Sequence, residues 1–142
     1  MKKPASLLTA ALLLTAAVGF AAQPMLNIRL VKLTGDGAVT PGLENIAAII
    51  RRNLPYAGCV LVDQQGCMMP PNATLAFRRG YTVVCSTLPE NAIGITIQKH
   101  RKMLLSTAVT LQGDSPVIIG GFGGGRRGAK HIFVLQKSPG TE

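Results

Sequence analysis

The sequence has 142 residues, of which 47% are hydrophobic and 15% charged, and its formal net charge is +9. This length accommodates one domain rather than two, and the basic excess favours anionic partners such as an acidic lipid, glycan or protein surface. Nucleic acid would also suit this charge. It is disfavoured as a partner because the chain has no Trp, few other aromatic side chains to stack on bases, and no recognisable groove-binding helix or zinc motif.

The chain begins with a pattern that is typical of a secretory signal peptide. Lys2 and Lys3 precede an uncharged apolar run over residues 5–20, and Gly19 and Ala21 suit the positions three and one before a cleavage site. The alternative is an uncleaved membrane anchor. It is disfavoured because a spanning helix needs about 20 apolar residues and this run is shorter.

We therefore expect residues 1–21 to be removed and residues 22–142 to form a single exported domain, periplasmic or secreted. Loss of Lys2 and Lys3 lowers the formal charge from +9 to +7, so the basic excess belongs to the folded protein. No transmembrane span is expected after cleavage.

The mature chain opens with a predicted strand. Leu26, Ile28 and Leu30 alternate with polar residues, which indicates a half-buried strand. The run from Val31 to Leu33 continues this strand out of phase, as a β-bulge would.

One amphipathic helix follows near the mature N-terminus. Thr40 is a suitable N-cap, Pro41 suits the first helical position, and the helix should end near Asn53, before Pro55. The apolar face is predicted to consist of Leu43, Ile46, Ala47, Ile50 and Leu54. The polar face should carry Glu44, Asn45, Arg51 and Arg52.

After Pro55 the pattern changes to short strands divided by turn residues. The predicted strands are 59–62, 74–77, 81–85, 93–98, 104–111, 117–119 and 132–135. This order predicts an α+β domain, mostly antiparallel β-sheet with the helix packed on one face. Strands 105–111 and 117–119 are expected to pair as a hairpin, with 132–135 in the same sheet.

The segment from Leu105 to Phe122 resembles the conserved hairpin of the secretins, the ring-shaped outer-membrane channels of secretion systems and pili. A strand, a Gly-containing turn, a short apolar strand ending in Gly120-Gly121 and a later strand follow in that order. The chain is too short for a secretin channel, so the resemblance implies a small exported relative or accessory protein. The whole layout is also similar to small exported bacterial proteins, a likeness that names no activity.

The most unusual local sequence is the glycine-rich segment that carries Arg126 and Arg127. Its backbone N–H groups and paired charges suit an anion, so these two arginines are the candidate anion-binding residues. The competing interpretation is a free hairpin tip, over residues 120–128, whose arginines keep it soluble, because a phosphate loop leads into a helix and a strand follows here.

Three cysteines in an oxidising compartment allow one disulfide, and Cys59 and Cys67 are the candidate pair, with Cys85 as a small buried hydrophobe. No CxxC or HxxxH spacing indicates a metal site, so neither a metal nor a cofactor is expected. His100 and His131 lie beside basic residues and are expected in solvent.

No pair of carboxylates, serine motif or cysteine–base arrangement suggests catalysis, so we expect a non-enzymatic protein. Two function classes remain. The first is a structural or assembly component of the cell envelope, partnered by an envelope protein assembly. The second is a soluble binder of anionic ligands, such as acidic lipid headgroups or glycans.

Overall fold

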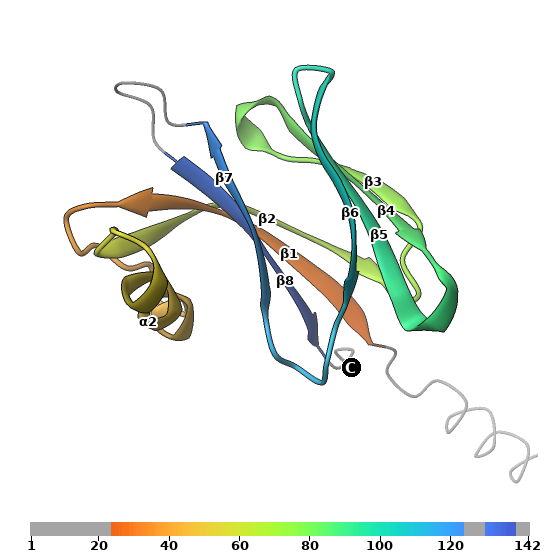
Figure 1. Cartoon of the computed structure of the whole chain (residues 1–142), viewed down its shortest axis with the longest axis horizontal. Coiled ribbons are helices and arrows are strands. Elements are labelled where there is room, and N and C mark those ends of the chain that lie inside the picture. The colour runs from red at the N-terminus through yellow and green to blue at the C-terminus, as the bar shows by residue number, and fades with distance from the viewer. Residues whose placement is uncertain (1–23, 124–129, 139–142) are drawn as a thin grey trace, which may run out of the picture.

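The structure is a computed structural model, and it describes residues 24–123 and 130–138. Two four-stranded antiparallel sheets face each other, and an α-helix covers the outer face of one of them (Figure 1). The predicted fold class is confirmed: α+β, mostly antiparallel sheet, with one α-helix in the described part of the chain. The predicted signal peptide, residues 1–21, and its predicted cleavage site lie outside the described residues.

The first sheet has the strand order β2-β1-β8-β7. Its strands, in chain order, are β1 (Met25–Thr34), β2 (Gly58–Met68), β7 (Val117–Gly123) and β8 (Lys130–Ser138). The helix α2 (Glu44–Asn53) connects β1 to β2 and packs on this sheet. Since β1 and β8 are the central strands, the sheet joins the two ends of the described chain.

The second sheet has the order β3-β4-β5-β6. Its strands are β3 (Ala73–Ala76), β4 (Tyr81–Thr87), β5 (Ala92–Lys99) and β6 (Lys102–Thr110). Short 3₁₀ turns at Arg78–Gly80 and Pro89–Asn91 connect β3 to β4 and β4 to β5, where turn residues predicted breaks. Consecutive strands are therefore neighbours throughout this sheet.

The two faces of β1 pack against different elements, one against the second sheet and the other against α2. This explains why the apolar residues of β1 shift by one position after Leu30. Leu30 and the alternate residues before it face the second sheet, whereas Val31 and Leu33 pack under α2. The extra residue at this point of the ladder is Val62 of β2, because Leu30 pairs with Asp63 and Val31 with Leu61. The predicted bulge thus lies in the partner strand, and β1 itself alternates regularly.

The helix begins later than predicted, because Thr40 and Pro41 precede it. Leu43 stands at the N-cap of α2 without a side-chain cap. Thr40 instead bonds to β2: its N–H donates to the carbonyl of Cys59 (3.1 Å), and its hydroxyl accepts from the N–H of Leu61 (2.9 Å). The predicted end at Asn53 is confirmed.

The predicted faces of the helix are confirmed with one exception. Ile46, Ala47 and Ile50 are buried against the first sheet, together with Leu43 at the cap. Leu54 is 42% exposed, so it belongs to the rim of the packed face rather than to its interior.

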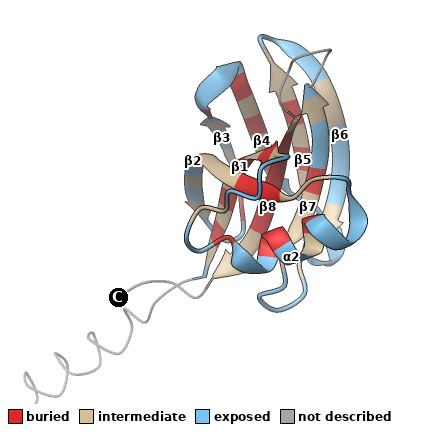
Figure 2. Cartoon of the chain, turned by 90° about the vertical axis from the view of Figure 1, so that its left-hand side faces the viewer, coloured by how far each residue is buried: buried red, intermediate tan, exposed pale blue. Residues whose placement is uncertain are grey.

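The main core fills the space between the two sheets (Figure 2). Phe133 of β8 lies at its centre, fully buried, with the rings of Phe77, Tyr81 and Phe122 around it. Their centroids are 5.4, 5.5 and 6.2 Å from that of Phe133, all edge-on. Edge-to-face packing at this distance is favourable for aromatic rings, so this cluster joins the sheets.

The predicted hairpin between strands 105–111 and 117–119 is wrong. β6 pairs with β5 in the second sheet, whereas β7 pairs with β8 in the first, so the segment 111–116 crosses from one sheet to the other. The part of the expectation that places 117–119 and 132–135 in one sheet is confirmed. This crossing is favoured because the apolar faces of β6 and β7 then both contact the core between the two sheets.

Candidate functional site

An apolar groove lies between α2 and the first sheet, at the end where β7 finishes and β8 begins. Its volume is about 610 Å³, within the range of about 300–1,000 Å³ that is usual for small-molecule sites. Residues from β1, α2, the segment after α2, β7 and β8 line it: Leu33, Ile49, Ile50, Asn53, Leu54, Pro55, Tyr56, Ile118, Gly120, Gly121, Lys130 and Ile132.

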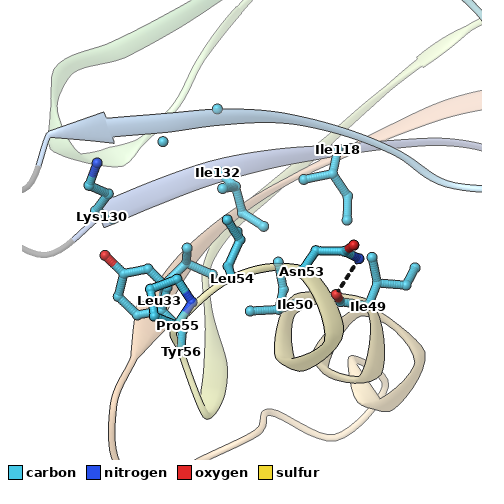
Figure 3. A pocket seen from close by; sticks show the side chains of 12 residues that line it. Leu33, Ile49, Ile50, Asn53, Leu54, Pro55, Tyr56, Ile118, Lys130 and Ile132 are labelled. Carbon is cyan, nitrogen blue, oxygen red and sulfur yellow. Dashed lines mark hydrogen bonds between the residues drawn. The ribbon is translucent and has the colours of Figure 1, made fainter.

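Polar groups are few in this groove and lie mainly at one end. Figure 3 shows Lys130 and the Tyr56 ring together at that end, with Ile49 at the other. The Asn53 side chain donates one of its two amide N–H groups to the Ile49 carbonyl oxygen at 2.8 Å, and it carries no charge. The ammonium of Lys130 is consequently the charged group that the groove offers to a ligand.

Two glycines form part of the groove wall in β7. Gly120 and Gly121 have φ of 148° and 98°, in the region that favours glycine, and the pairing with β8 is irregular between Gly120 and Phe122. A Cβ at Gly120 would lie 2.8 Å from the Ile132 Cα. Residues 120–123, the first part of the predicted free tip, therefore belong to strand β7. Because Gly120 and Gly121 have no side chains, only their backbone forms this part of the groove wall.

Sequence reasoning missed this groove. Neither Tyr56 nor Lys130 belongs to a recognisable sequence motif. Tyr56 follows α2 and Lys130 begins β8, so the two residues come together only in the folded sheet. The one available signal was Leu54, an apolar residue that continues the helix pattern past the last helical turn. The fold leaves it partly exposed at the groove.

A buried histidine lies on the opposite face of the first sheet, next to Lys130 in sequence. His131 is 5% exposed, which contradicts its predicted position in solvent, whereas His100 is exposed as predicted. The Tyr81 hydroxyl lies 3.4 Å from its Nδ1, and its Nε2 has no hydrogen-bond partner among the described residues. The two rings meet edge-on, with centroids 5.6 Å apart.

Several cations surround this histidine. Burial lowers the pKa of His131 below its ordinary value. The positive charges of Lys99, Arg79 and Lys32 lower that pKa further. Lys99 also lies over the Tyr81 ring, with Nζ 4.8 Å from the centroid. Together with Lys130, these residues make the start of β8 a basic end of the sandwich.

We expect the protein to lose stability as the pH falls from 7.5 to 5. Burial and the neighbouring cations disfavour protonation of His131 in the folded state, whereas the unfolded chain protonates it near pH 6.5. Its contribution is therefore fully present above about pH 6.5 and is lost as the pH falls through the lower folded-state pKa. The fall in Tm between these pH values should largely disappear in His131→Gln and persist in His100→Gln. Equal pH dependence in wild type and H131Q would contradict the assignment.

The predicted anion-binding residues, Arg126 and Arg127, lie outside the described residues. The described ends that flank them are Gly123 of β7 and Lys130 of β8. Lys130 lines the groove, whereas Gly123 does not.

The structure corrects the predicted disulfide pair. Cys59 and Cys67 both lie in β2, eight residues apart, which in a strand is roughly 26 Å. A disulfide needs Cα atoms less than about 7 Å apart, so these two cysteines cannot pair in this fold. Cys85 is buried in the core, as predicted.

Within residues 24–123 and 130–138, no three His, Cys, Asp or Glu side chains gather in an arrangement that could hold a metal ion. No helix in these ranges is both long and apolar enough to cross a membrane.

Comparison with known proteins gave no match to a family model, to a curated protein or to a solved structure.

Proposed function

We propose that this protein is an exported, non-enzymatic binder of anionic amphiphiles, molecules with an apolar chain and a negatively charged head. The groove between α2 and the first sheet receives the chain, and Lys130 pairs with the head. The observation that carries this proposal is the lining of the groove: apolar side chains along its length and a single cation at one end.

The apolar lining supports binding of a hydrocarbon chain. Leu54 is 42% exposed, and Ile118 and Tyr56 are only partly buried. A ligand that covers this surface removes it from water, which is worth about 25 cal/mol for each Å². Pro55 and the partly exposed Leu54 form a rim over which a flexible chain can enter.

Charge supports a negative head. The chain carries a formal charge of +9, or +7 without its first 21 residues, and four described cations lie around the start of β8. Lys130 is the one that lines the groove, whereas Lys32, Arg79 and Lys99 lie near His131. Such a concentration of positive charge attracts anions and repels cations.

Export is part of this proposal because the pattern of residues 1–21 motivates it. Outside the cytoplasm, acidic lipids, fatty acids and acylated glycans provide ligands of the required chemistry. The predicted loop cations, Arg126 and Arg127, would add to the attraction of the head, since they stand just before Lys130 in the sequence.

Titration with dodecanoate tests this function, with dodecanol as the uncharged comparison. Leu54→Asp places a carboxylate in the path of the alkyl chain and should weaken binding of both ligands about tenfold or more. Lys130→Glu replaces attraction of the head by repulsion and should weaken dodecanoate about tenfold while sparing dodecanol. Isothermal titration calorimetry at low and high salt gives the affinities.

The chain offers a matched control for each variant. Leu88→Asp makes the same change at a leucine that is 36% exposed and does not line the groove. Arg101→Glu makes the same charge reversal on an exposed turn between β5 and β6. Wild-type affinity in L54D would remove the groove from the proposal. An equal loss of dodecanoate affinity in R101E and K130E would mean that Lys130 acts only through the general positive charge of the surface.

The second candidate is a structural component of an envelope assembly, the role that the secretin-like segment implied. The observation that favours it is the outer edge of β6, which has no pairing strand among the described residues and carries Met103, 60% exposed. An edge of this kind can accept a strand from a partner. Light scattering should then give a mass above one chain. A monomer that recovers no partner from envelope extracts would contradict this role.

A further inference from the structure

Cys67 and Cys85 approach each other from opposite sheets. Cys67 lies in β2 of the first sheet and Cys85 in β4 of the second, and both contact the core between the sheets. Burial raises the pKa of both thiols, and each thiol also affects the pKa of the other, as expected for two side chains that lie close together.

The backbone pairing around the two cysteines explains this approach. The Gln65 side chain donates to the carbonyl of Ala76 at 3.3 Å, which holds the edge strand β2 beside the edge strand β3. Ala73 of β3 in turn pairs with Cys85 of β4. Cys67 is two residues beyond Gln65 and points to the same face, so it comes to the part of β4 that contains Cys85.

The third cysteine lies in a different core. Cys59 is buried between α2 and the first sheet, where its Sγ is 4.0 Å from the carbonyl oxygen of Leu43. Cys67 is only half-buried, whereas Cys85 is 1% exposed. An oxidant in solvent therefore reaches Cys67 first.

We propose that Cys67 and Cys85 form a disulfide that links the two sheets, and that Cys59 remains a thiol. The oxidant is another disulfide, either oxidised glutathione or a thiol–disulfide oxidoreductase. The Cys67 thiolate attacks that disulfide and releases one thiol, leaving a mixed disulfide on Cys67. The Cys85 thiolate then attacks the Cys67 sulfur and releases the second thiol. The two cysteines lose two protons and two electrons, and the oxidant takes up both.

Peptide mapping after oxidation tests the pairing directly. The full chain is incubated with oxidised glutathione, and free thiols are blocked with N-ethylmaleimide in denaturant. Cleavage with trypsin and an Asp-specific protease then separates all three cysteines, into peptides 53–62, 63–78 and 80–99. We expect peptides 63–78 and 80–99 to be joined, lighter by two hydrogen atoms than their sum, and peptide 53–62 to carry the maleimide.

Each other outcome overturns the proposal. Three blocked thiols would mean that the bridge does not form, and glutathione retained on peptide 63–78 would mean that Cys85 cannot resolve the intermediate. A bridge that includes peptide 53–62 would mean that Cys59 participates. The Cys59→Ala variant should form the same bridge as wild type, whereas Cys67→Ser should form none.

The bridge should also be visible in thermal stability. It closes a loop of the unfolded chain from β2 to β4, so the oxidised protein should have a Tm higher by about 10 °C or more than the reduced protein. Cys67→Ser should melt at the same temperature with and without reductant. The groove and Lys130 do not take part in this chemistry, so the bridge and the proposed amphiphile binding are tested independently.

Discussion

Phe133→Ala should destabilise the protein by about 4 kcal/mol, the largest loss expected from any single core truncation. Phe133 is fully buried between the sheets, and three aromatic rings pack edge-on around it. Removing the ring leaves a cavity that residues of two rigid sheets cannot close, and such truncations cost about 3–5 kcal/mol. Urea denaturation followed by circular dichroism measures the change. Since marginal domains have only about 5–15 kcal/mol in total, the variant should be partly unfolded at 37 °C.

Phe122→Ala is the matched control, because it deletes the same side chain from the margin of the same cluster. Phe122 is only partly buried, and its ring centroid is the furthest from Phe133, at 6.2 Å. We expect a loss of about 1–2 kcal/mol, in proportion to the smaller area covered. Equal losses in the two variants would mean that Phe133 is not the centre of the core.

The second large effect is expected for Gly58→Ala at the start of β2. An added Cβ would overlap the backbone oxygen of Ala38 and lie 2.7 Å from its nitrogen. The same contact includes the hydrogen bond from the Cys59 N–H to the Ala38 carbonyl, 2.8 Å. Backbone cannot rotate away as a side chain can, so the substitution must displace this segment. We expect a loss of about 3 kcal/mol in urea denaturation.

Gly66→Ala in the same strand gives the control for Gly58→Ala. A Cβ there would meet the Leu26 carbonyl oxygen at 3.5 Å, an ordinary contact. The free energy of unfolding should change by no more than about 1 kcal/mol. Alanine lowers the conformational entropy of the unfolded chain, and this stabilising effect offsets any strain in the folded strand. The Ala38 segment leads into α2, so G58A should also weaken dodecanoate binding, and G66A should not. Comparable destabilisation by both variants would show that strand propensity, rather than the Ala38 contact, accounts for the loss.

Local pattern was sufficient to predict much of the fold. Ile93, Ile95 and Ile97 alternate in the sequence and are all buried on one face of β5. Pro89 and the two residues after it break the chain where the structure has a 3₁₀ turn. Alternation and turn chemistry act over a few residues, and this is why sequence reasoning located these elements.

Pairing between distant strands was less predictable. β2 runs from Gly58 to Met68, although only 59–62 was predicted, because Asp63, Gln64 and Gln65 interrupt the apolar pattern. β2 is an edge strand, and polar residues are tolerated there. The false hairpin of β6 with β7 has a similar origin, since nearness in sequence favours a hairpin and only the complementary faces of two sheets decide against it.

The candidate site depended on tertiary structure more than the fold did. Lys130 and Tyr56 are separated by more than half of the described chain, and they share a groove because α2 packs on the sheet to which β8 belongs. The cysteines illustrate the same point. Sequence distance favoured Cys59 with Cys67, whereas the sandwich brings Cys67 to Cys85.

The pairing of β1 with β8 determines the order in which the molecule can fold. Met25 pairs with Ser138 and Lys32 with His131, so the first strand completes its hydrogen bonds only with the last. The second sheet contains only pairs of consecutive strands and can form while the rest of the chain is still emerging. Until β8 arrives, β1 has one open edge and Phe133 is missing from the core. A nascent chain is therefore expected to pass through a state in which the second sheet has formed and its apolar face is still exposed. In that state the protein depends on prompt completion, or on a chaperone, to avoid aggregation.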